Sequence, residues 1–119
     1  MPLANTPLGK LTIVATYAFH DEPLLFVCRN ASTLYIATLS AEENDTRTWL
    51  YVPITLLRFA QLRNGSIDFH DAFTKSETGM VYEFKVDSAG AVDTKFRWAS
   101  EVTDDELPVP GELAIEVKS

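Results

Sequence analysis

Cysteine is almost absent from this chain: among its 119 residues, only Cys28 carries a thiol. A single cysteine cannot form an internal disulfide or supply a cysteine-rich metal site, which indicates a reducing compartment. Long apolar runs are missing too, because stretches such as Leu24–Cys28 are much shorter than the roughly 20 residues that cross a bilayer. The first residues show no basic segment followed by an apolar one, as a secretory signal would. We therefore expect a cytoplasmic protein with no membrane span.

Positive charge is also scarce. The chain holds 10 Lys and Arg residues against 17 Asp and Glu residues, a net charge of −7. Residues 76–119 carry ten of the acids and only four of the bases, so the acidity is C-terminal. Duplex-binding proteins normally present a basic stripe, and this sequence has no cluster of Lys or Arg. We expect no direct contact with nucleic acid, and we interpret the acidity either as a solubility device or as attraction to a basic protein partner.

Sequence motifs of known catalytic chemistry are absent as well. The chain has no glycine-rich nucleotide loop, no nucleophile elbow and no H-E-x-x-H zinc motif. His20 and His70 lack the short spacing that presets a metal geometry. The run Asp68–Asp71 places His70 between two carboxylates that could bind a cation, although helix capping explains both acids. Cys28 shares an apolar strand face and is expected to be buried and inert. We expect no cofactor and no metal, which disfavours an enzyme.

The length and composition predict a single folded domain over residues 1–119. A chain of this length builds one hydrophobic core. Its 46% hydrophobic and 11% aromatic residues exceed what a disordered chain carries. Residues 1–10, with two prolines and a glycine, are predicted to be an irregular lead-in. Residues 103–119 form an acidic C-terminal loop, in which Leu113, Ile115 and Val117 could add a short last strand.

Alternating apolar residues predict an α+β fold with an antiparallel sheet. Short polar turns separate four predicted strands, which are typical of a four-strand meander: residues 11–19, 24–29, 34–39 and 47–52. Because Pro53 has no N–H to donate, we expect the fourth strand to end before it.

Two short helices are predicted after this meander. Thr55 can cap a helix that runs to Arg63 or Asn64, where Gly65 suits the left-handed position after the last turn. Asp68 can cap a second, shorter helix.

A C-terminal β-hairpin is the element that the sequence specifies most tightly. Residues 80–87 and 92–98 alternate apolar and polar side chains around a three-residue loop, in which Gly90 takes a positive φ. This register predicts two opposite-charge pairs on a solvated face, Lys85 with Asp93 and Glu83 with Lys95. The other face is predicted to be buried, and it carries Met80, Tyr82, Phe84, Phe96 and Trp98.

Several short runs together resemble a family of uncharacterised small bacterial domains. They occur in the family's order over roughly residues 17–111: Pro23–Phe26, Leu34–Ala37, Thr48–Pro53, Asp71–Phe73 and Leu107–Gly111. The resemblance implies a bacterial or phage origin and no known activity.

Two groups of residues are candidates for contacts with a partner. Tyr35, Trp49 and Tyr51 alternate with aliphatic residues, so both faces of the third and fourth strands are apolar and something must cover the second face. Either the helix over residues 56–63 packs there, or Trp49 and Tyr51 stay partly exposed as interface anchors, a role that Trp and Tyr favour. The second group is acidic and consists of Asp104, Asp105 and Glu106.

These observations leave three hypotheses for the function. The first is a non-catalytic protein-binding domain, such as an immunity-type inhibitor, an antitoxin or an accessory subunit, which binds a basic bacterial protein. The second is a small enzyme or ligand-binding domain whose site is built from loop residues such as His20, His70 and Arg29. The third is a structural homo-oligomer formed through an edge strand.

Overall fold

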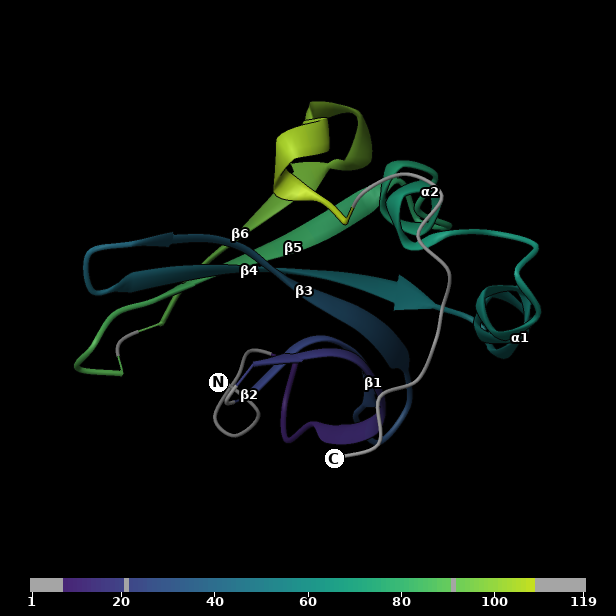
Figure 1. Ribbon diagram of the computed structural model, residues 1–119, viewed down its shortest axis with the longest axis horizontal. Helices are drawn as coiled ribbons and strands as arrows, with labels where there is room; N and C mark the ends of the chain where they lie inside the picture. Colours follow the sequence, from purple (N-terminus) through teal and green to yellow (C-terminus); the bar gives the residue numbers. More distant parts are fainter. Residues whose placement is uncertain (1–7, 21, 91, 109–119) are drawn as a thin grey trace.

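The computed structural model of the chain describes residues 8–20, 22–90 and 92–108 (Figure 1). The described part contains one antiparallel sheet of six strands in the order β1-β2-β3-β4-β5-β6, so every strand pairs with its neighbours in sequence. The predicted α+β class with an antiparallel sheet is confirmed. The strands are β1 (Thr12–His20), β2 (Glu22–Arg29), β3 (Leu34–Glu43), β4 (Thr46–Ile54), β5 (Met80–Val86) and β6 (Val92–Trp98).

The arrangement of the strands differs from the predicted one. We expected a four-strand meander followed by a separate hairpin, whereas β4 pairs with β5 from Arg47↔Val86 to Tyr51↔Tyr82. Two helices, α1 (Leu56–Asn64) and α2 (Phe69–Thr74), connect these strands and return the chain to the side of β4. The hairpin therefore extends the meander into one continuous sheet.

Pro53 does not end β4, as we had expected. It lies inside the strand, opposite Tyr35 of β3. Pairing with β5 stops earlier, at Tyr51, so at Pro53 only β3 runs alongside. A residue without an N–H is tolerated where a strand has a neighbour on one side only.

The predicted caps of both helices are confirmed. The Thr55 hydroxyl accepts the Arg58 N–H at 3.1 Å, and Gly65 follows α1 with φ of 81°. The Asp68 carboxylate accepts the Asp71 N–H at 2.7 Å at the start of α2. These local hydrogen bonds satisfy N–H groups that a helix leaves without an internal partner, which is why short-range sequence signals locate both helices.

The side chains of the strands alternate between two apolar cores. In Figure 1, α2 lies above the sheet, while β1 and β2 lie below β3 to β6. The upper core joins aliphatic residues of β2 to β5 with Phe69, Ala72 and Phe73 of α2. The lower core is rich in aromatic residues and is enclosed by the sheet and the segment before β1; it contains Leu11, Phe26, Cys28, Tyr35, Ala37, Trp49, Tyr51 and Phe84.

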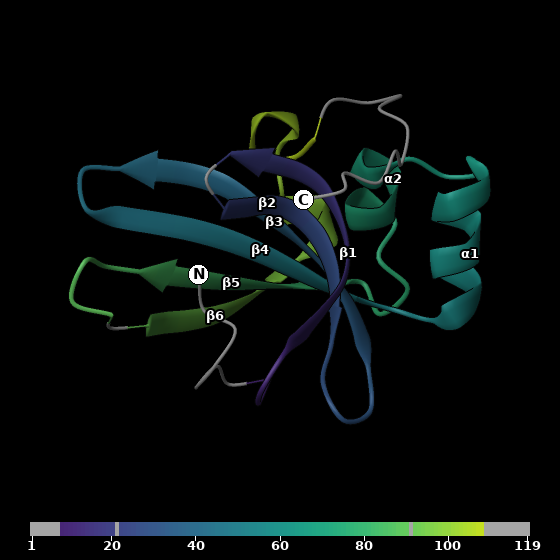
Figure 2. The same ribbon diagram turned by 60° about the horizontal axis from the view of Figure 1, so that its bottom comes forward.

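Helix α1 covers neither face of the central strands, which corrects one of the two alternatives that we considered. It lies beyond the end of the sheet, next to the end of β4 (Figure 1 and Figure 2). Leu62 is its one fully buried residue, whereas Leu56 and Leu57 are 77% and 69% exposed. The shorter helix α2 covers the sheet because Phe69 and Phe73, one turn apart, point into the upper core.

Two 3-10 turns follow β6, and the second lies in the predicted acidic loop. They are η1 (Ala99–Glu101) and η2 (Asp104–Glu106), and η1 places Ala99 in the upper core. The predicted lead-in falls mostly, and the predicted last strand at Leu113, Ile115 and Val117 entirely, outside the described residues.

Candidate functional site

Four side chains of β5 and β6 form an aromatic patch on the surface. Because side chains alternate along a strand, Met80, Tyr82, Phe96 and Trp98 share one face of the hairpin. Phe96 and Trp98 are each 60% exposed, and the Tyr82 and Phe96 rings lie 4.9 Å apart between centroids. We name this group the aromatic patch. It corrects our prediction that Phe96 and Trp98 are buried.

The patch is exposed because of the position of β6 in the sheet. The predicted register is correct: Tyr82 faces Phe96 and Met80 faces Trp98. The buried aromatic core reaches Phe84 and then Tyr82, whose ring lies 6.3 Å from that of Tyr35. β6 is the last strand of the sheet, so within the described chain its outer side chains have a neighbouring strand on one side only. The aromatic core thus continues onto the surface at this edge.

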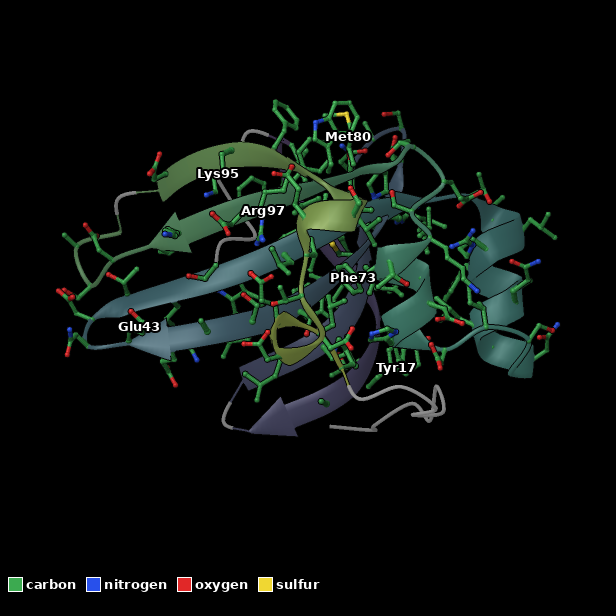
Figure 3. The ribbon with its side chains drawn as sticks, turned by 90° about the horizontal axis from the view of Figure 1, so that it is seen from above. Tyr17, Glu43, Phe73, Met80, Lys95 and Arg97 are labelled. Carbon is green, nitrogen blue, oxygen red and sulfur yellow. The ribbon has the colours of Figure 1, made fainter. Side chains whose placement is uncertain are left out.

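The opposite face of the hairpin carries a network of charges centred on Arg97 (Figure 3). Its guanidinium binds both carboxylate oxygens of Glu106, at 2.5 and 3.1 Å, and one oxygen of Glu83 at 3.2 Å. Lys95 Nζ lies 3.3 Å from the other oxygen of Glu83. The cross-strand pair of Glu83 and Lys95 is therefore confirmed. The face is less solvated than predicted, because Glu83 is only 5% exposed.

This network fastens the chain after β6 to the sheet. Arg97 also donates a hydrogen bond to the Glu101 carbonyl at 2.9 Å. The hydrogen bond from Arg97 lowers the pKa of Glu106 below its ordinary value, and the same bond raises the pKa of Arg97. Because Glu83 is buried, removing Arg97 would leave the Glu83 carboxylate short of a partner, which destabilises the folded state. We conclude that Arg97, Glu83 and Glu106 stabilise the fold.

The three acids predicted to contact a partner have different environments. Glu106 is held by Arg97, as described above. Asp104 Oδ1 lies at hydrogen-bond distance, 2.7 Å, from His70 Nε2, although the Asp104 side chain is 83% exposed. Asp105 is exposed and accepts a hydrogen bond from the Thr103 hydroxyl. Only Asp104 and Asp105 therefore present a carboxylate largely to solvent.

The three aromatic residues predicted as interface candidates lie in the lower core. Trp49 and Tyr51 are fully buried and Tyr35 is 6% exposed, so the expectation that Trp49 and Tyr51 stay partly exposed is wrong. The Tyr51 ring packs 4.9 Å from that of Phe84, and the Phe26 ring lies 5.9 Å from that of Trp49. The curvature of the sheet covers these rings without a helix, which the residue pattern of two strands does not reveal.

Cys28 is buried, as predicted. Its side chain is 0% exposed in the lower core, and this burial raises the pKa of the thiol to about 12. At neutral pH the group is therefore a thiol rather than the nucleophilic thiolate.

Two residues of the alternative ligand site, Arg29 and His70, do not line one cavity. Arg29 lines a cavity of about 520 Å³ together with the β2–β3 turn and Thr55, and His70 is not among the lining residues. The side chain of His20 lies outside the described part of the structure. The described residues thus place Arg29 and His70 at separate sites.

His70 belongs to a cluster that could hold a cation. Ligand atoms of Asp68, His70 and Asp71 all lie within 4.8 Å of one another. Both carboxylates already have protein partners, because Asp68 caps α2 and Asp71 Oδ2 lies 3.6 Å from Lys75 Nζ. The hydrogen bond with Asp104 raises the pKa of His70 above its ordinary value. Capping and ion pairing account for each of these side chains.

Sequence reasoning named the residues of the aromatic patch but assigned them to the wrong environment. The alternation that identified Phe96 and Trp98 as one strand face is a local signal. Their exposure depends on β6 being the edge strand, which is a property of the whole sheet. The sequence of the hairpin itself holds no signal for this exposure.

The fold and the site define a small α+β domain with an open antiparallel sheet and an aromatic edge. In the described residues, no helix combines the length and the apolar character needed to cross a membrane. The chain belongs to a family of unknown function, DUF6575, whose model matches residues 2–116. This match confirms the resemblance to an uncharacterised family without known activity. Neither the curated proteins nor the solved structures contain a match to the chain.

Proposed function

We propose that this chain is a non-catalytic protein-binding domain that uses the aromatic patch to bind a protein with a basic surface. The single observation that carries the proposal is the 60% exposure of both Phe96 and Trp98 on an edge strand. Large aromatic side chains are rarely left side by side in water, and exposed apolar groups of this kind mark interaction sites. Trp and Tyr are also the residues that most often dominate binding energy at protein interfaces.

The charges around the patch support a basic partner. Asp93 of β6 is exposed, and so are Glu101, Asp104 and Asp105 in the turns that follow. The two cations of the strand, Lys95 and Arg97, already pair with Glu83. Lys85 of β5 lies opposite Asp93 in the register, but the exposed acids outnumber it, so the net charge beside the patch is negative, which steers a positively charged protein toward it.

The kind of bacterial system in which the domain acts is part of the same proposal. A small acidic domain with one partner-binding surface fits an immunity-type inhibitor, an antitoxin or an accessory subunit of a bacterial system. A cytoplasmic location agrees with a single cysteine kept as a buried thiol.

A comparison of three proteins tests the proposal. Wild type, the Phe96→Ser/Trp98→Ser variant and the Leu56→Ser/Leu57→Ser variant are used to capture proteins from the native cell, and the retained protein is then purified and titrated by calorimetry. The control variant removes two exposed leucines of α1, which are not part of the patch. We expect a basic protein in 1:1 ratio with wild type and control, a loss of affinity of at least about 30-fold in the patch variant, and weaker binding in higher salt.

Two results would overturn the proposal. One is a partner retained equally well by the patch variant. The other is self-association of the chain with no retained protein, which would favour the homo-oligomer.

A further inference from the structure

The outer edge of β6 has backbone groups that no described residue satisfies with a hydrogen bond. Along an antiparallel strand, successive residues direct their N–H and C=O groups to opposite sides. The Ala99 N–H points inward, because it donates to the Gly79 carbonyl beside β5 at 2.9 Å. The Trp98 N–H points outward and donates to the Glu101 carboxylate at 2.9 Å. By the same alternation, the backbone groups of Phe96 and Thr94 point outward.

These outward groups form a short docking edge. No described residue bonds the N–H or C=O of Thr94 or Phe96 on the side away from β5. Glu101 closes the edge at Trp98, so the open stretch is only a few residues long. An edge strand with unpaired backbone groups is a template for another strand, and β-strand addition is a common mode of peptide recognition.

We infer that the partner binds by adding an extended, basic segment to β6 as a seventh strand. This inference rests on the proposed function and deepens it. Backbone hydrogen bonds to Thr94 and Phe96 hold the segment, while the aromatic patch receives every second side chain. The remaining side chains of the segment lie over the charged face of β6, beside the exposed carboxylate of Asp93.

Charge decides in favour of a basic segment over a second copy of this chain. Residues 77–106 hold eight acids and three bases, so two copies joined through β6 would bring two negative surfaces together. Asp93 is exposed and, although Lys85 lies opposite it in the register, it has no ion pair with a described residue, whereas Lys95 is already paired with Glu83. A segment with alternating basic and apolar residues matches both rows of β6 side chains.

A peptide probe tests the inference on the full chain. The probe is a heptapeptide of alternating lysine and valine with an acetylated N-terminus and an amidated C-terminus. Its binding is measured by amide NMR and hydrogen exchange of the isotope-labelled protein. We expect saturable shifts at Thr94 and Phe96 and slower exchange of these two amides. Two N-methylated versions, each methylated on one alternate set of amides, are the controls. Methylating the set that faces β6 should weaken binding at least tenfold, and methylating the other set should leave it within about threefold.

A substitution in the protein provides the second arm. Thr94→Pro removes an outward N–H without removing a hydrogen bond to β5, a position where strands tolerate proline. Thr94→Val keeps the N–H and is the matched control. We expect the proline variant to lose at least tenfold in affinity for the peptide and the valine variant to retain it. The peptide arm stands by itself if the proline variant does not fold.

The outcomes separate this inference from the proposed function. Equal losses with both methylated peptides, or unchanged exchange at Phe96, would overturn strand addition. If a natural partner still depends on Phe96 and Trp98 in that case, the protein-binding function stands without it. Protection of the Thr94 and Phe96 amides from exchange could also increase with protein concentration when no peptide is present. That result would show pairing with a second copy and would also overturn the inference.

Discussion

The two tryptophans of this chain are both strand residues and have opposite environments. Trp49 is fully buried between β3 and β5, whereas Trp98 is 60% exposed on β6. A buried tryptophan contributes packing to the folded state, whereas an exposed one contributes little until a partner covers it. The same residue type therefore has a structural role in one place and is available for recognition in the other.

This difference predicts opposite responses to substitution. Trp49→Ala should lower the free energy of unfolding by about 3–5 kcal/mol, since it leaves a cavity in the lower core. Trp98→Ala should change it by less than about 1 kcal/mol, because little buried surface is lost. Urea unfolding followed by circular dichroism measures both. A large loss of stability on replacing Trp98 would mean that the residue serves the fold and would remove its availability for a partner.

The buried thiol of Cys28 gives a second prediction at this scale. Because burial raises the pKa of the thiol to about 12, the native protein should react with a thiol reagent only as fast as it unfolds. Cys28→Ala should cost about 1 kcal/mol of stability through lost packing. Reaction rates with and without urea test this. Rapid labelling of the folded protein at pH 7 would contradict the described burial.

At the scale of elements, η2 is fastened to the body of the protein at both of its ends. Asp104 bonds His70 of α2, and Glu106 bonds Arg97 of β6. The two contacts depend on pH in opposite directions. Glu106 has a lowered pKa, so its contribution is present above the unfolded value of 4.5 and is lost as the pH falls through the lowered value. His70 has a raised pKa, so its contribution is present below 6.5 and is lost as the pH rises through the raised value.

Two single variants measure these contributions separately. The difference in unfolding free energy between wild type and Glu106→Gln should be constant above about pH 4.5 and shrink at lower pH. The difference between wild type and His70→Gln should be full below about pH 6.5 and shrink at higher pH. Urea unfolding at a series of pH values gives both curves. Differences that do not change with pH would show that these contacts carry no charge-dependent stability.

Local sequence signals predicted the elements well. The caps Thr55 and Asp68, the left-handed Gly65 and the register of Lys85 against Asp93 are all confirmed. Gly90 has φ of 86°, as the three-residue loop requires. Each of these features depends on residues close in sequence or directly across one hairpin, so the physical cause is present in the local pattern. The turns η1 and η2 were not predicted, although Glu101 and Glu106 cap them locally by accepting the N–H groups of Trp98 and Thr103.

At the scale of the whole molecule, topology decides which face is buried, and local pattern does not. Trp49 and Phe96 both alternate with polar or aliphatic neighbours, yet β4 is central and β6 is at the edge. The curved sheet supplies its own cover for the aromatic core, and α1 is left beyond the end of the sheet. The candidate site thus arises where the aromatic core reaches an uncovered edge, a property that no single element contains.

The most direct test of the central claim is photocrosslinking at the aromatic patch in the native cell. Benzoylphenylalanine, a photoreactive amino acid, replaces Trp98 in one strain and Leu57, on the exposed side of α1, in another. The account predicts one crosslinked product from position 98, a basic protein identified by mass spectrometry, and no such product from position 57. No crosslinked protein at position 98, or the same products from both positions, would contradict the account.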